Sequence, residues 1–273
     1  MGTLYVVGTP IGNLEDLSSR ALRVLRQVSL VAAEDTRKTG ALFSRFDIHT
    51  SLTSYFEHNK LTKLEAILEA LERGDVALVS EAGLPGLSDP GYELIHAAIG
   101  AGVPVVPIPG PVAATVALVV SGLPTDSFTF LGFLPRRASE RRRALQEVAA
   151  ERRTLVLYEA PHRLADCLED IEFVLGDRPI AVARELTKLH EEIYRGTVHG
   201  AREHFARGEV RGEVTLVVGG ATKEAVTWDE EHVRLALNEA INHGMDRKEV
   251  VRQVTQRSGW PRRDVYRLAL EFK

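Results

Sequence analysis

The sequence has little of several features that often reveal a function. It holds a single cysteine, Cys167, which excludes an internal disulfide and a cysteine-based zinc cluster. No apolar run is long enough to cross a membrane, and Met1 leads directly into an expected strand rather than a signal peptide. No two histidines have metal-ligand spacing on a shared helix face, so we predict no metal. These features are typical of a protein of the reducing cytoplasm.

Sequence patterns that bind phosphate are also missing. Neither GxxxxGK[ST] nor GxGxxG occurs, so a nucleoside triphosphate or a nicotinamide dinucleotide is not the expected ligand. A dinucleotide-dependent oxidoreductase is therefore only a distant alternative. The formal net charge is −4, so any binding of nucleic acid has to depend on local basic patches and not on the whole surface.

The most distinctive stretch that is present reads SEAGLPGLSDPG, at residues 80–91. The apolar run 76–79 before it predicts a buried parallel strand, and residues 92–101 predict a helix after it. Glycine and proline prevent the strand from continuing and favour a long fixed loop. Loops at the carboxyl ends of parallel strands often bind ligands. The loop is thus either a binding site, with Glu81 and Asp89 as its charges, or a structural connection.

Similar units of strand, turn and helix recur through residues 1–120, which predicts an N-terminal α/β domain with a parallel sheet. One further strand, 30–33, ends in the polar cluster EDTRK at 34–38, which is either a solvated loop with an ion pair or a functional segment. In one of the other two expected units, the strand is 3–7, the turn 8–13 and the helix 14–27. In the other, the strand is 104–108, the turn 109–111 and the helix 112–120.

The pattern changes after residue 120, where strands outnumber helices and predict a second, mixed α/β domain over residues 121–222. A helix expected at 135–151 begins with arginines, and because cations oppose the dipole at a helix N-terminus, their placement indicates either phosphate binding or a solvated charged face. These arginines are Arg136, Arg137, Arg141, Arg142 and Arg143. The expected strands are 128–134, 154–158, 180–184, 193–198 and 214–218.

Residues 223–273 predict a small all-helical module. A turn at 258–261 between two short helices is typical of an arrangement like a helix-turn-helix. From residue 247 onward the chain has eight basic and three acidic residues. The module is either a nucleic-acid contact that uses Arg262 and Arg263, or a packing or dimerisation unit. The expected helices are 228–243, 247–256 and 262–270.

Eight short motifs occur in one order along the chain: GTPIGNL at 8–14, AEDTR at 33–37, SEAGLPGLSDPG at 80–91, PGPVAA at 109–114, GFLP at 132–135, YEAPHR at 158–163, RELTK at 184–188 and GEVTLVV at 212–218. Together they resemble the tetrapyrrole methylase family over residues 4–220, and the helical tail also fits. The resemblance implies a class III methyltransferase made of two α/β domains, with S-adenosylmethionine folded into the cleft between them. It also implies a homodimer.

Within the family, the chain is most similar to a branch that acts on ribosomal RNA. The resemblance implies methylation of the 2′-hydroxyl of a cytidine in the 16S rRNA of the small ribosomal subunit. A methylase of a corrin or similar macrocycle has the same fold but would not need the basic segments. A non-enzymatic regulator that binds RNA or DNA through the terminal helices would have no use for three Gly/Pro loops at strand ends.

The resemblance also implies which residues hold the cofactor. The loop 80–91 departs from the commoner SDAGTP form by carrying Glu81 and Leu84, and Glu81 keeps the carboxylate with a longer reach. The expected cofactor contacts are Pro10, Ser80, Ala82, Gly83, Asp89, Val112 and Ala113 from the first domain, and Ala160, Gly212 and Glu213 from the second.

Methyl transfer to a ribose oxygen needs alignment of the nucleophile, the methyl group and the sulfur, and a base would help a weak nucleophile. The sequence does not choose among the carboxylates that follow expected strands, which are Glu34, Asp35, Glu81 and Glu159. The catalytic candidates are Asp35, Arg37, Glu81 and Glu159. Contacts with the RNA backbone are expected from Arg37, Lys38, Arg136, Arg137, Arg141, Arg262 and Arg263.

Overall fold

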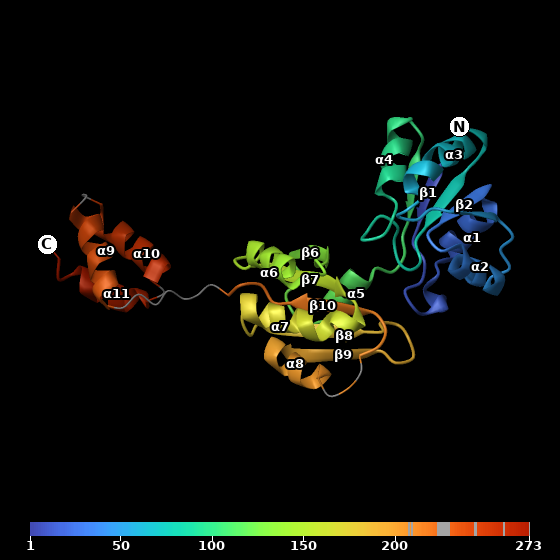
Figure 1. Ribbon diagram of the computed structural model, residues 1–273. Helices are drawn as coiled ribbons and strands as arrows, with labels where there is room; N and C mark the ends of the chain where they lie inside the picture. Colours follow the sequence, from blue (N-terminus) through green and yellow to red (C-terminus); the bar gives the residue numbers. More distant parts are fainter. Residues whose placement is uncertain (207, 209, 223–229, 243–244, 259, 273) are drawn as a thin grey trace. The chain divides into compact units, whose positions relative to one another are not determined.

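The computed structural model describes residues 1–206, 208, 210–222, 230–242, 245–258 and 260–272. The chain divides into two compact units, Met1–Ala221 and Thr222–Lys273. The larger unit contains two five-stranded sheets with helices packed on them, and the smaller unit is helical (Figure 1). The expected class of two α/β sheets followed by a helical segment is therefore confirmed.

The first sheet is entirely parallel, with strand order β3-β2-β4-β1-β5. Its central strand, β4, is buried along its whole length, because helices cover both faces of the sheet. Ala77 and Val79 face the core formed with α1 and α2, whereas Val76 and Leu78 face the core formed with α3 and α4. The strands are β1 Leu4–Val7, β2 Leu30–Ala33, β3 Ser51–Ser54, β4 Val76–Val79 and β5 Val105–Ile108. The helices are α1 Ser19–Gln27, α2 Thr36–Arg45, α3 Lys60–Arg73 and α4 Tyr92–Gly100.

Two local features of this sheet were not predicted. The single helix predicted for 14–27 is a short 3-10 helix, η1 Leu14–Asp16, followed by α1. The break arises because the Ser18 hydroxyl accepts the Ala21 N–H at 3.0 Å and so starts a new helix. The polar cluster at 34–38 is not a loop, because Asp35 caps the start of α2 by accepting the N–H groups of Arg37 and Lys38.

The second sheet is mixed, with order β6-β7-β10-β8-β9 and only β6 and β7 parallel. One face packs against α6, α7 and α8, and the other face is covered by α5, which directly follows the first sheet. Because α5 shares this core with Ile11, the two sheets are joined by a common apolar contact. The strands are β6 Phe128–Phe133, β7 Thr154–Glu159, β8 Pro179–Arg184, β9 Glu192–Thr197 and β10 Val214–Val218. The helices are α5 Ala113–Val120, α6 Ala138–Glu147, η2 Pro161–Arg163, α7 Leu164–Leu175 and α8 Val198–Phe205.

The arginines near the start of α6 have two different environments. Arg136 and Arg137 precede the helix and are exposed. Arg141 is only 4% exposed, and its Nη2 lies 2.6 Å from a carboxylate oxygen of Asp170 in α7, which is itself 2% exposed. Arg142 lies 2.5 Å from the other oxygen of the same carboxylate. This triad joins α6 to α7, so the Arg141 guanidinium is not available to a phosphate and we no longer propose it as an RNA contact.

Asp170→Ala is expected to destabilise the protein by about 3–5 kcal/mol, because it leaves the guanidinium of Arg141 buried without a partner. Denaturant unfolding measures this change in the free energy of unfolding. Glu169→Ala is the control, because Glu169 is the next carboxylate in sequence and is exposed. Its loss should change the free energy of unfolding by no more than about 0.5 kcal/mol. A loss below about 1 kcal/mol for Asp170→Ala would show that the triad does not hold α6 and α7 together.

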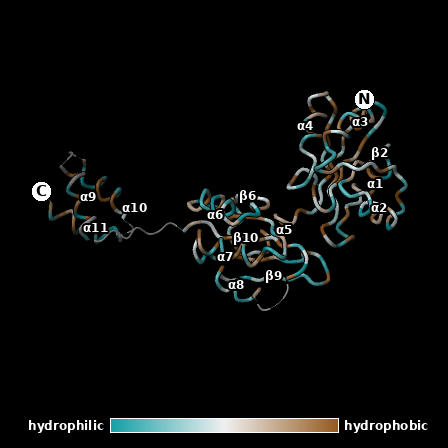
Figure 2. Tube along the Cα trace, in the orientation of Figure 1, coloured by the Kyte–Doolittle hydropathy of each residue, from teal (hydrophilic) through white to brown (hydrophobic). Residues whose placement is uncertain are grey.

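The smaller unit consists of α9 Glu230–Asn242, α10 Arg247–Ser258 and α11 Arg262–Ala269, and residues 228, 229 and 243 of the first expected helix lie outside the described residues. The helices enclose a core of aliphatic side chains. In Figure 2 the trace of this unit alternates between hydrophobic (brown) and hydrophilic (teal) residues. The outer side of α11 is basic and partly aromatic. Its exposed residues are Arg262, Arg263, Tyr266 and Arg267, with Leu270 just beyond the helix.

Three further observations bear on function class. Among the described residues, no helix combines the length and the apolar character needed to span a bilayer. The same part of the chain holds no cluster of His, Cys, Asp and Glu side chains arranged to bind a metal. Cys167 is fully buried, and burial raises the pKa of its thiol well above the usual value, so it is not an activated nucleophile.

Candidate active site

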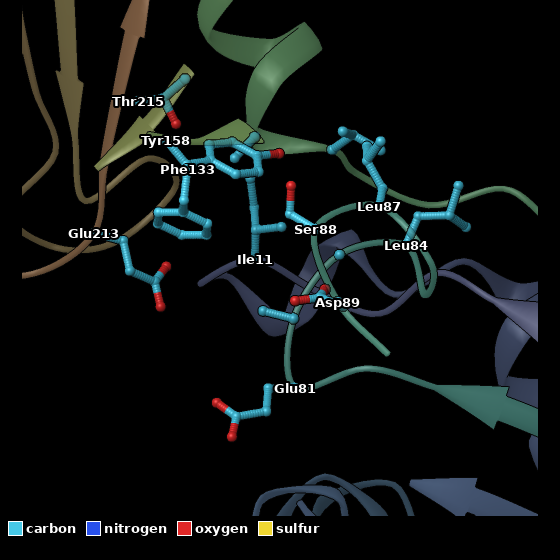
Figure 3. A pocket seen from close by; sticks show the side chains of 14 residues that line it. Ile11, Glu81, Leu84, Leu87, Ser88, Asp89, Phe133, Tyr158, Glu213 and Thr215 are labelled. Atoms are coloured by element: carbon cyan, nitrogen blue, oxygen red, sulfur yellow. The ribbon is translucent and has the colours of Figure 1, made fainter. Parts of the chain in front are cut away.

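A cavity of about 260 Å³ opens where loops from both sheets converge, and we call it the central cavity (Figure 3). The turn after β1, the loop after β4 and the start of α5 form one wall, and the ends of β6, β7 and β10 form the other. Two of the Gly/Pro loops singled out in the sequence therefore line one cavity, together with the residues that directly follow the third loop. Its lining residues are Ile11, Glu81, Ala82, Gly83, Leu84, Leu87, Ser88, Asp89, Val112, Ala113, Phe133, Tyr158, Glu213 and Thr215.

Glycine is required where the loops of the first sheet touch. Gly83 has a φ of +79°, in the left-handed region that favours glycine. Its backbone pairs with that of Thr9 through two hydrogen bonds of 2.8 and 3.1 Å. A Cβ on Gly8 would lie 2.7 Å from the backbone of Gly110, so those two loops pack with no room for a side chain. These contacts hold the three loops in fixed relative positions around the cavity.

The side of the cavity formed by the loop after β4 carries negative charge. Burial raises the pKa of Asp89 to about 7, and the nearby carboxylate of Glu34 adds to the shift, while a hydrogen bond from Ser80 opposes it. The carboxylates of Glu81 and Glu213 act on Asp89 in the same direction as Glu34. A partly buried carboxyl among other carboxylates gains from a nearby cation, so this side of the cavity favours a positively charged ligand.

The opposite side is aromatic. The Tyr158 hydroxyl oxygen accepts the Ala114 N–H at the start of α5 at 3.2 Å, which ties the two walls together. The rings of Phe130 and Phe133 contact Tyr158, with centroids 5.1 and 5.5 Å away. Burial raises the pKa of Tyr158, so the side chain stays a neutral phenol. This wall suits a flat or apolar part of a ligand.

Glu81 lies where three cavities meet. It lines the central cavity, a second cavity of about 240 Å³ and a third of about 430 Å³. Its carboxylate pairs with the Lys38 ammonium, and its N–H donates to a carboxylate oxygen of Glu34 at 3.1 Å. Burial is the main reason that the pKa of Glu34 is raised. The second cavity is lined by Thr9, Pro10, Leu14, Lys38, Thr39, Ala41, Leu42, Ser80 and Glu81.

Most of the residues expected to hold the cofactor lie on these walls. Pro10 and Ser80 line the second cavity, and Ala160 and Gly212 do not line the central one. The aromatic wall was missed by sequence reasoning, because apolar strand ends have no signature beyond their place in the GFLP and YEAPHR motifs. The expected cofactor residues that line the central cavity are Ala82, Gly83, Asp89, Val112, Ala113 and Glu213, and the catalytic candidate Glu81 lines it as well.

Two of the carboxylates considered as bases have other roles in the structure. The side chain of Glu159 is fully buried, accepts the Ala160 N–H at 2.8 Å and lies 3.2 Å from the Arg163 guanidinium. Asp35 caps α2, and its hydrogen bonds with Arg37 hold its pKa at about 2, which makes it a poor proton acceptor. Neither carboxylate is therefore suited to act as the base.

The two α/β lobes that converge on this cavity have the fold of known methyltransferases. The family of Tetrapyrrole (Corrin/Porphyrin) Methylases matches residues 3–201, and the chain belongs to this family. The crystal structure of uroporphyrin-III-C-methyltransferase from Thermus thermophilus superposes with a TM-score of 0.55 at 25% identity, covering 80% of this chain and 94% of that one.

Relatives with higher sequence identity have names that specify a substrate. The chain is 48% identical over 273 residues to ribosomal RNA small subunit methyltransferase I of Halalkalibacterium halodurans, covering 98% of this chain and 94% of the relative. It is 47% identical over 221 residues to the protein of that name from Thermotoga maritima, covering 81% of this chain and 99% of the relative. About a fifth of this chain thus has no counterpart in the second relative, a share similar in size to the helical unit.

The chain is an enzyme, a methyltransferase whose cofactor is S-adenosylmethionine. The residues of the central cavity fit this group. The cofactor carries a sulfonium and an ammonium cation, which match the carboxylates of Asp89 and Glu213. Its adenosine matches the apolar and aromatic wall formed by Ile11, Phe133 and Tyr158.

Proposed function

We propose that the chain methylates the 2′-hydroxyl of a cytidine in the 16S rRNA of the small ribosomal subunit, in the cytoplasm and as a homodimer. The proposal depends mainly on one observation. The chain is 48% identical, over nearly its full length, to a relative named for methylation of small-subunit ribosomal RNA. The convergence of three cavities on one carboxylate supports it, because an RNA methyltransferase needs adjoining places for a donor and a large acceptor.

The central cavity holds S-adenosylmethionine, which supplies an electrophilic methyl group on a cationic sulfur. Asp89 contributes negative charge toward the cations of the cofactor. Ile11 and Tyr158 exclude water and orient the adenosine. The chain thus acts mainly by positioning, which can lower a barrier by several kcal/mol when the reacting atoms are aligned.

Glu81 accepts the proton of the ribose hydroxyl as that oxygen becomes a nucleophile. It is 42% exposed, so a substrate can reach it, and it borders the central cavity. The Lys38 ammonium holds its carboxylate in place. Glu34 accepts the Glu81 N–H and fixes the backbone at this position. Of the catalytic candidates that the sequence left open, Glu81 is the one whose position supports the role of base.

RNA phosphates are bound by exposed cations near the cavity mouth and on the helical unit. The Arg37 side chain is 91% exposed at the start of α2, and Lys38 lies beside it. Arg136 and Arg137 are exposed before α6. Arg262 and Arg263 contribute from α11. Such contacts position the substrate and provide salt-dependent affinity without reading the base.

The direct test supplies labelled S-adenosylmethionine with purified small ribosomal subunits that lack the modification, and in parallel with a free corrin or porphyrin macrocycle. We expect label in the 16S rRNA at the 2′-oxygen of one cytidine and none in the macrocycle. Transfer to the macrocycle alone would favour the small-molecule methylase. Binding of RNA without any binding of the cofactor would favour a regulator.

Arg262→Gln with Arg263→Gln is expected to weaken RNA binding and to make its salt dependence shallower. Each lost phosphate contact should reduce the slope of log affinity against log salt by about 0.7–0.9. The maximal rate at saturating RNA should stay near that of the wild type, because the Thermotoga maritima relative lacks a counterpart for about a fifth of this chain.

Arg252→Gln is the control for this pair, because Arg252 is exposed on the neighbouring helix α10 and is paired with Glu249 at 2.5 Å. It should leave the salt slope unchanged. If the double variant also keeps the wild-type slope, the helical unit is a packing or dimerisation module and takes no part in RNA binding.

A further inference from the structure

The third cavity lies beside the central cavity and is not needed to hold the cofactor. Its volume is about 430 Å³, and Glu81 lines both this cavity and the central cavity. It is formed where β2 and β3 end, next to the loop that follows β4. Because parallel strands end at one edge of the sheet, this cavity opens on the edge that carries the proposed base. Its lining residues are Glu34, Asp35, Thr36, Arg37, Ser54, Phe56, Glu57 and Glu81.

One wall of the third cavity presents the ring of Phe56, which is 37% exposed on a short turn after β3. The turn is fixed by Asn59, whose side-chain oxygen accepts the Phe56 N–H at 2.8 Å and whose own N–H donates to the Phe56 carbonyl at 2.9 Å. The Asn59 side chain also donates to Ser54. The edge of the ring is supported by His58, with centroids 6.3 Å apart and planes at 81°. These hydrogen bonds fix the backbone that carries the Phe56 side chain, which lines the cavity.

The polar groups around this ring are mainly acceptors. Glu34, Asp35, Glu57 and Glu81 contribute carboxylates, and that of Glu57 also pairs with the Lys60 ammonium at 2.8 Å. The one guanidinium of the wall belongs to Arg37, which lies at the exposed rim. The combination favours a flat ring that donates hydrogen bonds and is attached to an anionic group. Cytosine in a nucleotide has this chemistry, since its exocyclic amine is a donor that carboxylates accept.

We propose that the third cavity receives the base of the target nucleotide, stacked on Phe56, with its exocyclic amine facing Glu34 and Glu57. This inference rests on the proposed function and adds where the acceptor nucleotide is bound. Arg37 then meets a phosphate of the same nucleotide. The ribose lies between the third and the central cavity, beside Glu81, which is where the 2′-hydroxyl has to be.

The arrangement requires the target nucleotide to leave its stack in the RNA, as in other enzymes that act on single nucleotides. Stacking on an aromatic side chain compensates for the lost base stacking. The carboxylates also provide selectivity, because uracil has a carbonyl oxygen where cytosine has its amine, and that oxygen would be repelled.

The test measures methyl transfer to small ribosomal subunits and cofactor affinity for Phe56→Leu, Phe56→Trp and the wild type. We expect Phe56→Leu to lower kcat/KM for the subunits roughly ten- to a hundredfold, the range for loss of one stacked base, with unchanged cofactor affinity. Phe56→Trp should restore most of the rate, since it restores an aromatic face. Phe173→Leu is the control, because Phe173 is also exposed but lies on α7, outside the third cavity.

The outcomes separate this inference from the proposed function. If the wild type methylates subunits and Phe56→Leu does so within twofold of it, the base is bound elsewhere and the proposed function stands. If the wild type transfers no methyl group to subunits, the proposed function itself fails. Subunits with uridine at the target position should react at least tenfold more slowly, and equal rates would overturn the contact between the amine and the carboxylates.

Discussion

Asp89→Asn is expected to weaken the binding of S-adenosylmethionine about ten- to a hundredfold, the range for loss of a hydrogen-bonded charge partner. Asp89 is the carboxyl in the central cavity whose environment most disfavours its own charge, since burial and Glu34 raise its pKa to about 7. A cationic ligand stabilises the ionised form of Asp89. Asparagine has nearly the same shape but no charge, so it lacks this interaction. Isothermal titration calorimetry measures the affinity of both proteins.

The pH dependence makes this prediction sharper. Binding of a cation favours ionised Asp89, so the affinity of the wild type should fall as the pH drops below about 7, where a proton occupies the carboxyl in the free protein. The fall should approach tenfold per pH unit below that value. Asp89→Asn should lack this dependence. A wild-type affinity that is flat between pH 5.5 and 8 would remove Asp89 from contact with the cofactor's charge.

The same substitution should stabilise the protein without ligand. An acid whose pKa is raised on folding contributes stability that is present at low pH and is lost as the pH rises from the unfolded value of 3.8 to about 7. Above pH 7 the wild type therefore contains a partly buried charge that Asp89→Asn lacks. We expect the variant to be more stable at pH 8 by about 1–2 kcal/mol, reduced from the full shift because solvent screens the group.

Glu81→Gln is expected to lower kcat for methyl transfer by about 10²–10⁴-fold, the usual range for loss of a general base. The cofactor affinity should change by less than about threefold, because Glu81 lies at the rim of the central cavity while the rest of its wall is intact. Single-turnover transfer to small ribosomal subunits, with the cofactor saturating, isolates the chemical step.

Glu93→Gln is the matched control for Glu81→Gln. Glu93 is a partly exposed carboxylate of the same lobe that is ion-paired with Lys60 at 2.5 Å, as Glu81 is with Lys38. Its loss should leave kcat close to that of the wild type. A Glu81→Gln rate within tenfold of the wild type would mean that Glu81 is not the base and that positioning alone accounts for the reaction.

The strand ends and loops around the central cavity were predictable because glycine, proline and apolar runs mark them locally. β3 was missed, since its sequence SLTS is short and polar and the strand forms at the edge of the sheet. α2 was missed for a similar reason, because its start depends on capping by Asp35 in a segment of mixed composition. Both elements border the third cavity, so its existence was not predictable from the sequence.

Charge was the least reliable guide to function. Arg141 and Arg137 are close neighbours in sequence, yet the first is buried against Asp170 and the second is exposed. The difference depends on which side of α6 faces α7, and the partner is about thirty residues away in sequence. Glu159 and Glu81 differ in the same way, because only the folded structure shows that Glu159 is fully buried beside Arg163, whereas Glu81 is 42% exposed beside Lys38.

The measurement that most directly tests the central claim is a crystal structure of the protein with S-adenosylhomocysteine, the demethylated form of the cofactor. The account predicts the ligand in the central cavity, with its adenosine against the Tyr158 wall, its charged end near Asp89 and its sulfur open toward Glu81. A ligand bound outside the cavity between the loop after β4 and the end of β7 would contradict it.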